Sequence, residues 1–268
     1  MKNEKNQELK RHLANSHFAE FGYWDGCRTT TRFTVFCLLA ISAVACQKQS
    51  TPLTVEPSSV VLYSDGTRQL AANPAEGVTY ASNDEFYASV DENGLVTGNK
   101  VGETEIVASS SNGTVTIPVT VVSQYSLYPD LASLINSPLS SMTDMLGAGY
   151  QTSTSETGET GYTYLDYNEY TAAILVCFDG GSCSKVFTMI STSYMSKFTS
   201  YLIERYAVAG MQNDYYYFLN HDKNVVITMT LYNAKYIATL YMPYTGTKSC
   251  EVDVNDILER IQGSGLLY

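Results

Sequence analysis

The sequence predicts two folded parts of different class, an all-β sandwich over residues 52–122 and an α+β domain with an antiparallel sheet over residues 123–268. Residues 52–122 contain short alternating runs rich in Val, Thr and Ser, separated by turn signals, which is typical of a sandwich of short strands. From Ser123 onward Tyr and Met become frequent and helical spacing of apolar residues appears. We therefore place a domain boundary near Ser123.

An apolar run from Phe33 to Ala45 precedes these parts and ends in the small residues Ala43-Val44-Ala45 and then Cys46. The run is too short to span a bilayer, which takes about 20 apolar residues, but it has the length of a signal-peptide core. Its end resembles the lipobox of bacterial lipoproteins. The resemblance implies removal of residues 1–45, lipidation of Cys46, a tether over residues 46–51 and membrane attachment through the lipid.

The charge that remains after this leader excludes some partners. The leader carries 6 of the 16 Lys and Arg and 4 of the 27 Asp and Glu residues, so the remainder has a formal charge of −13. A body this acidic repels phosphate groups, and nucleic acid is therefore not an expected partner. Gln47 rather than Asp follows the cysteine, which favours the outer membrane, while the periplasmic or surface facing stays open.

Turn dipeptides divide the first part into strands. The strongest is Asn93-Gly94, between Ala88–Asp91 and Leu95–Gly98, because both residues tolerate the positive φ of a tight hairpin. With Gly66-Thr67, Val78-Thr79-Tyr80 and Gly102–Ile106, this order resembles the group 2 bacterial immunoglobulin-like (BIG2) domain. The resemblance covers residues 52–122 and implies a spacer or adhesion module without chemistry of its own. Asp91 and Glu92 could bind calcium, but solvated carboxylates beside a turn are the simpler interpretation.

The second part shows the same order of elements twice. Helices are expected at residues 130–135, 138–146, 194–202 and 253–261, and alternating strands follow the second and the third of them. We infer a tandem α-β-β-β-β unit whose antiparallel sheet packs its helices on one face. This order loosely resembles the duplicated folds of the β-lactamase inhibitor protein and the TATA-binding protein, which implies no shared function.

Three cysteines remain beside Cys46. Cys177 and Cys183 flank an Asp-Gly-Gly turn, so we expect a disulfide across a hairpin if the compartment is oxidising. Pairing of Cys250 with either strand cysteine is the alternative. A zinc site is not expected, because His221 is the sole histidine after the leader.

No pattern in the chain indicates catalysis. His221 lies in a polar predicted turn, where we expect an exposed and inert side chain, and Asp253 and Asp256 suit the first turn of a helix. A nucleophile elbow, a phosphate loop and a pair of metal ligands are all lacking from the sequence after Cys46. We expect neither a catalytic residue, nor a metal, nor a cofactor.

Tyrosines are the candidate binding residues. They crowd two equivalent predicted strands, and alternation sends neighbours to opposite faces, so we expect Tyr164 and Tyr216 on an exposed sheet face. The simpler alternative is that these tyrosines only cover the solvent-exposed face of the antiparallel sheet and bind no partner. The sequence therefore predicts a non-enzymatic envelope lipoprotein that binds an unknown protein or glycan partner for adhesion or assembly. An envelope hydrolase or hydrolase inhibitor is the alternative function.

Overall fold

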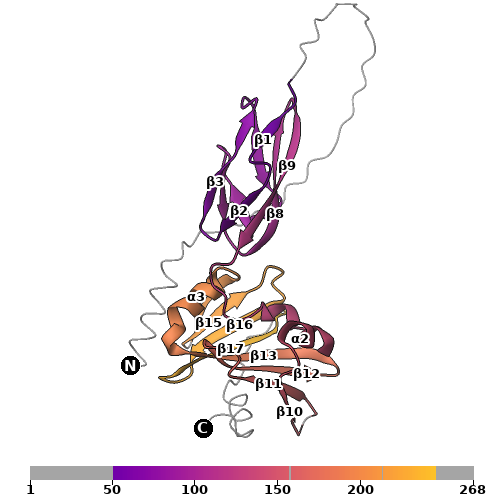
Figure 1. Ribbon diagram of the computed structural model, residues 1–268, viewed down its shortest axis with the longest axis vertical. Helices are drawn as coiled ribbons and strands as arrows, with labels where there is room; N and C mark the ends of the chain where they lie inside the picture. Colours follow the sequence, from indigo (N-terminus) through magenta and orange to yellow (C-terminus); the bar gives the residue numbers. More distant parts are fainter. Residues whose placement is uncertain (1–50, 157, 213, 246–268) are drawn as a thin grey trace, which may run out of the picture.

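The computed structural model describes residues 51–156, 158–212 and 214–245. Two parts follow one another along its long axis, with the first part above and the second below (Figure 1). Their apolar cores are separate, because one cluster of buried side chains draws on residues 53–121 and two others draw only on residues from Leu127 onward. Among the described residues no helix combines the length and apolar character that crossing a bilayer requires.

The first part is all β, as the sequence predicts. Its sheets have the strand orders β2-β9-β8-β5, β3-β7-β6 and β1-β4, and β2 runs parallel to β9. The strands are β1 (Thr54–Glu56), β2 (Val60–Tyr63), β3 (Thr67–Gln69), β4 (Ala71–Asn73), β5 (Thr79–Ser82), β6 (Ala88–Val90), β7 (Leu95–Gly98), β8 (Gly102–Ser110) and β9 (Gly113–Val122).

The expected hairpin at Asn93-Gly94 is confirmed by the antiparallel pairing of β6 with β7. Gly94 has a φ of 79°, and an added Cβ would lie 2.9 Å from the Tyr80 ring, so this position suits glycine in both conformation and space. The Asp91 carboxylate accepts hydrogen bonds from the backbone N–H of Asn93 and of Leu95, at 2.9 and 2.8 Å. Asp91 thus stabilises the turn, which is the role of an Asx residue rather than of a metal ligand.

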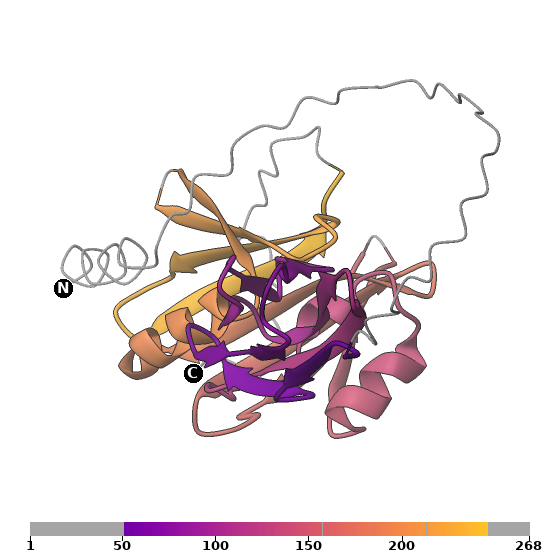
Figure 2. The same ribbon diagram turned by 90° about the horizontal axis from the view of Figure 1, so that it is seen from above.

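The second part is largely one antiparallel sheet of eight strands, so the expected α+β class is not confirmed in full. The strand order is β10-β11-β12-β13-β17-β16-β15-β14, and the helices are short (Figure 2). The elements are η1 (Leu131–Leu134), α2 (Leu139–Leu146), β10 (Gln151–Thr154), β11 (Thr160–Leu165), β12 (Thr171–Asp179), β13 (Ser182–Ser191), η2 (Thr192–Tyr194), α3 (Met195–Ile203), β14 (Ala207–Gln212), β15 (Tyr215–Leu219), β16 (Val225–Leu231) and β17 (Tyr236–Pro243).

The sheet order is symmetrical about its centre. One helix and four strands, α2 with β10 to β13, precede another helix and four strands, α3 with β14 to β17, and the last strands of the two sets pair with each other. The segment 130–135 forms only a 3₁₀ turn, capped by the Asp130 carboxylate, instead of the expected helix. The expected terminal helix at 253–261 lies outside the described residues.

All the described helices cover the same face of this sheet. Their buried side chains, such as Leu134, Met142, Phe198 and Leu202, belong to one cluster with strand residues that include Ile174. The amphipathic spacing in α3 accounts for this, because Phe198, Tyr201 and Leu202 recur at helical intervals and all are fully buried. The upper end of this helix layer faces the first part, which positions the site described next.

Candidate functional site

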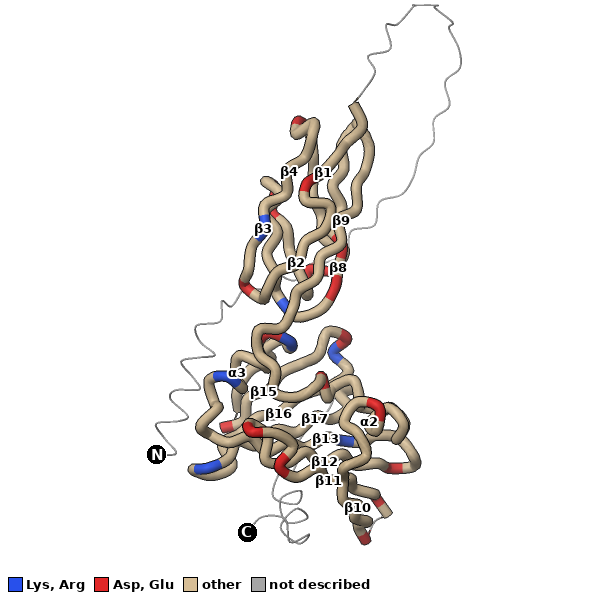
Figure 3. The backbone as a smooth tube through the Cα atoms, viewed as in Figure 1, with Lys and Arg blue, Asp and Glu red and all other residues tan. Residues whose placement is uncertain are grey.

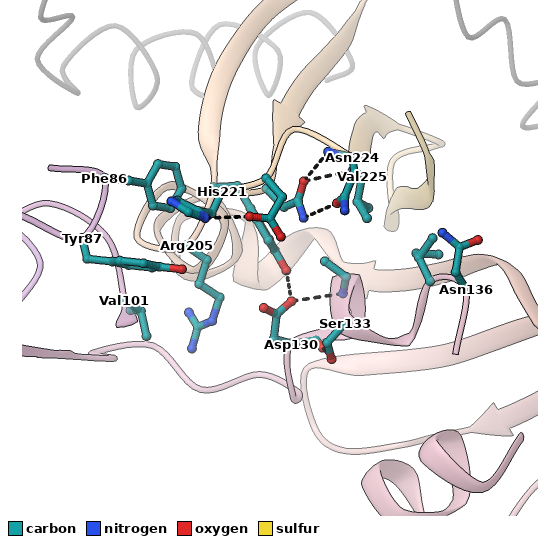
Figure 4. Close-up of a pocket in the computed structure, with 15 residues that line it drawn as sticks. Phe86, Tyr87, Val101, Asp130, Ser133, Asn136, Arg205, His221, Asn224 and Val225 are labelled. Carbon is teal, nitrogen blue, oxygen red and sulfur yellow. Dashed lines mark hydrogen bonds and ion pairs between the residues drawn. The ribbon is translucent and has the colours of Figure 1, made fainter. Parts of the chain in front are cut away.

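A pocket of about 400 Å³ lies where the two parts of the chain meet. Phe86, Tyr87 and Val101 come from the first part, and the other lining residues come from η1, the end of α3 and the β15–β16 hairpin (Figure 4). That second group comprises Asp130, Ala132, Ser133, Ile135, Asn136, Arg205, Tyr206, Asn220, His221, Asp222, Asn224 and Val225.

One wall of the pocket is made by the end of α3, where a buried carboxylate holds the connecting segment. Glu204 is the C-cap residue of α3 and is only 3% exposed. Its carboxylate accepts hydrogen bonds from Gln124 N at 3.0 Å, Tyr125 N at 3.2 Å and Ser123 Oγ at 2.7 Å, and it pairs with Arg205. A negative charge is unfavourable at a helix C-terminus. The hydrogen-bond donors and Arg205 therefore stabilise the Glu204 carboxylate at this position. We call this set the Glu204 junction.

The first part also reaches the C-terminal end of α3. Lys100 Nζ donates to the carbonyl oxygen of Ile203, and Val101 N donates to that of Glu204, both at 2.7 Å. A cation is favourable at this end of a helix, and these two donors satisfy carbonyls that have no partner within the helix. Burial lowers the pKa of Lys100, against the opposing effect of Asp65. Charged residues of both parts therefore meet at this junction (Figure 3).

The β15–β16 hairpin makes a second contact with the first part through His221. His221 Nε2 lies 2.7 Å from an oxygen of Asp84, and Nδ1 lies 2.9 Å from Asp222. The imidazole stacks on Tyr87 at 5.1 Å and meets Phe86 edge-on at 5.0 Å (Figure 4). His221 is exposed, as expected for a residue in a polar turn, and its side chain also joins the two parts, which the sequence did not indicate.

The carboxylates of the pocket already have structural partners. Asp130 accepts a hydrogen bond from Ala132 N at 3.0 Å and another from the Tyr206 hydroxyl. Burial, and next the charge of Asp130, raise the pKa of Tyr206 well above its usual value, so this hydroxyl remains a donor. The described residues contain no group of three or more His, Cys, Asp or Glu able to hold a metal ion. The pocket thus offers amides, hydroxyls and aromatic rings to a ligand.

The structure contradicts the expected exposure of the two candidate binding tyrosines. Tyr164 and Tyr216 are each 3% exposed and lie in the core under the helices. The Tyr164 hydroxyl donates to the carbonyl of Gly147 at 2.6 Å, and burial raises the pKa of Tyr164 to about 12. Alternation correctly separated neighbouring tyrosines onto two faces, but it did not reveal which face the helices cover.

The expected disulfide between Cys177 and Cys183 does not fit the sheet. Both residues are buried, but Cys183 lies in the cluster under the helices and Cys177 in the cluster on the opposite face. Cys177 is opposite Lys185, and Cys183 is opposite Phe178, because the register shifts between them. The hairpin therefore separates the two sulfur atoms. Cys46 and Cys250 lie outside the described residues.

Comparison with solved structures gives low similarities. An intimin mutant from EHEC O157:H7 is 17% identical with a TM-score of 0.22, over 50% of this chain and 90% of that one. Domains 5–6 of the S-layer protein SbsC are 14% identical with a TM-score of 0.23, over 74% and 86% of the two chains. A cysteine-rich secretory protein of Staphylococcus aureus subsp. aureus Mu50 is 9% identical with a TM-score of 0.27, over 50% and 59%.

The comparison with curated proteins finds no match. A family model does match the first part: residues 49–121 fit the Bacterial Ig-like domain (group 2), which agrees with the resemblance seen in the sequence and with the all-β structure of this part.

Proposed function

We propose that this protein is a non-enzymatic lipoprotein of the cell envelope that binds a protein or glycan partner in adhesion or assembly. In this proposal the Ig-like part is a spacer, and the second part is the binding module. The match of residues 49–121 to the Ig-like family supports a role of this kind at the cell surface. We further propose the outer membrane as the location.

The Glu204 junction is the observation that carries the proposal. A spacer is useful when it holds the module at a fixed distance and angle, and a bare linker after β9 would not do so. Here the segment that follows β9 is fixed by three hydrogen bonds to one buried carboxylate. Lys100, Val101 and His221 add contacts on either side of it. We infer that these contacts hold the two parts in one fixed arrangement.

We place the partner contact at the interdomain pocket, since the two candidate tyrosines of the sheet, Tyr164 and Tyr216, are buried. Its rim carries the exposed residues Ser133, Asn136 and Asp222. Hydroxyl and amide groups next to the Phe86 and Tyr87 rings suit a neutral polar surface such as a glycan or a polar peptide segment. Because Asp130 and Asp222 are both engaged in structural contacts, hydrolysis at this pocket is not proposed.

Site-specific photocrosslinking in cells tests this placement. A photoreactive phenylalanine analogue at Ser133 should give an adduct with an envelope component, because this residue is exposed at the pocket rim. The matched control is the same analogue at Asp179, which is exposed on the β12–β13 hairpin and does not line the pocket. Adducts of equal yield at both positions, or none at Ser133, would contradict a specific contact at the pocket.

The lipid anchor has its own prediction. Cys46→Ala should move the protein from the membrane fraction to the soluble fraction, because acyl chains supply partitioning energy at about 0.8 kcal/mol per buried methylene. Fractionation followed by immunoblotting measures the shift, and Cys177→Ala is the control that should leave the protein in the membrane fraction. Unchanged fractionation of Cys46→Ala would exclude lipidation at this residue. Protease treatment of intact cells then distinguishes the surface from the periplasm.

A further inference from the structure

Both ring nitrogens of His221 face carboxylates, one in each part of the chain. Nε2 lies 2.7 Å from Oδ2 of Asp84 in the first part, and Nδ1 lies 2.9 Å from Oδ1 of Asp222 in its own hairpin. A neutral imidazole has one N–H and one lone pair, whereas a charged imidazolium donates from both nitrogens. Both contacts are therefore hydrogen bonds only when the ring is charged. We call the pair of His221 and Asp84 the latch.

The loops that carry the latch hold its two members in position. Asp84 Oδ1 accepts a hydrogen bond from Phe86 N at 3.0 Å, while Oδ2 faces the histidine. In the β15–β16 hairpin, the Asn220 side-chain oxygen accepts from Asn224 N at 3.0 Å and from Val225 N at 2.9 Å. Local bonds of this kind fix a turn. The latch thus forms between two loops that are already ordered, which keeps the entropic cost of the contact small.

Carboxylates dominate the surroundings of the latch. Burial raises the pKa of Tyr87, which stacks on the imidazole, and three carboxylates raise it further: Asp84, Asp222 and Asp130, in that order. The Tyr87 hydroxyl is therefore uncharged near neutral pH. A neutral imidazole would present its lone pair to one of the carboxylates beside it, which is a repulsive contact.

The cations nearby do not replace the charge of the histidine. Among the described residues that line the pocket, Arg205 is the one Lys or Arg, and its guanidinium already pairs with Glu204 and donates to Tyr201 O. Lys223 is an exposed residue of the hairpin turn. Histidine is the side chain whose charge ordinarily changes between about pH 5 and 8. The latch is therefore the contact of this interface that responds to pH in that range.

We propose that the latch assembles the interdomain pocket at acidic pH and releases it as the pH rises. With the ring charged, Phe86 and Tyr87 stay against the hairpin, and the pocket has both of its walls. With the ring neutral, the contact to Asp84 weakens, and the first part turns away about the connecting segment, which the Glu204 junction holds. The inference rests on the proposed function only for what the pocket binds.

The exposure of the latch sets the size of this effect. The side chains of His221 and Asp84 are 39% and 31% exposed. Ion pairs this open to solvent change an equilibrium by a factor of about two to five. We therefore expect the ratio of closed to open molecules to fall about two- to fivefold between about pH 5 and 8.

Amide hydrogen exchange in the full chain measures this ratio without any ligand. Val101 lines the pocket, and its N–H donates to Glu204 O across the boundary, so it exchanges when the first part turns away. Its protection, relative to an unstructured amide at the same pH, should fall about two- to fivefold from about pH 5.5 to about pH 8. The reference is the N–H of Tyr206, which donates to Leu202 O inside the second part and should keep its protection.

Asp84→Asn identifies the group responsible. The amide oxygen of the new side chain still accepts from Phe86 N, but the negative charge is gone, so Val101 should show equal protection at both pH values. His221→Gln should have the same effect. The control is Glu103→Gln, at an exposed position on β8 in the same part as Asp84, and it should behave like the native chain.

The outcomes separate the latch from the proposed function. Equal protection of Val101 at both pH values in the native chain would overturn the latch. A fall in protection that persists in Asp84→Asn, or that Tyr206 shares, would overturn it as well. The crosslink at Ser133 tests what the pocket binds, and a failure there leaves the exchange result in force.

Discussion

Glu204→Ala is expected to lower the free energy of unfolding of the second part by about 3–5 kcal/mol, the usual cost of removing one partner from a buried ion pair. The change leaves Arg205 without its carboxylate partner and takes the acceptor from Gln124 N and Tyr125 N. It also removes the contact that fixes the connecting segment. Urea unfolding followed by tyrosine fluorescence measures the loss.

The control for this variant is Glu103→Ala, because Glu103 is an exposed carboxylate on β8 of the first part. We expect it to change stability by no more than about 0.5 kcal/mol. Small-angle scattering should show a broader distribution of shapes for Glu204→Ala than for Glu103→Ala. Equal stability and equal scattering of the two variants would refute the assigned role of the Glu204 junction, and with it the stiff spacer.

Tyr164→Ser is the second large expected effect, and it separates a core role from a binding role. Truncating a buried aromatic side chain costs about 3–5 kcal/mol. Tyr164 is in the core under the helices and donates a hydrogen bond to Gly147 O. Thermal or urea unfolding is therefore expected to shift strongly.

Tyr63→Ser provides the matched control, because Tyr63 is 53% exposed on β2. We expect a change within about 0.5 kcal/mol. If Tyr164→Ser changed the free energy of unfolding only slightly, Tyr164 would have to be a surface residue, which would contradict the structure. The phenylalanine variant isolates the hydroxyl: Tyr164→Phe loses one hydrogen bond, and about 1 kcal/mol is expected from that alone.

The sequence predicted those features that local chemistry determines. The Asn93-Gly94 turn and the amphipathic α3 are examples, since the signals lie within a few neighbouring residues. The sheet face on which each tyrosine side chain lies could not be predicted from neighbouring residues. In β12 every residue from Ala173 to Phe178 is buried, so alternation gives no contrast between the two faces.

The candidate site was missed for a different reason. Glu204 and His221 act on residues about 80 and 137 positions earlier in the chain, through an arrangement that only the contact between the two parts creates. In the sequence, Glu204 lies at the end of a helix and His221 in a polar turn, and side chains at such positions are usually exposed to solvent. A carboxylate at a helix C-terminus was the one available signal, because that position is electrostatically unfavourable without a partner.

The symmetrical strand order has a consequence for how the chain folds during synthesis. β13 pairs with β12 on one side, but its other neighbour is β17, the last of the strands that the structure describes. The ribosome must first add residues 192–235, which takes roughly 2 to 9 s at about 5–20 residues per second. Through that interval β13 carries an open hydrogen-bonding edge, a template for pairing with another nascent chain. The Ig-like part is complete by Val122, so it can fold earlier, and the second part is the one that depends on protection from aggregation.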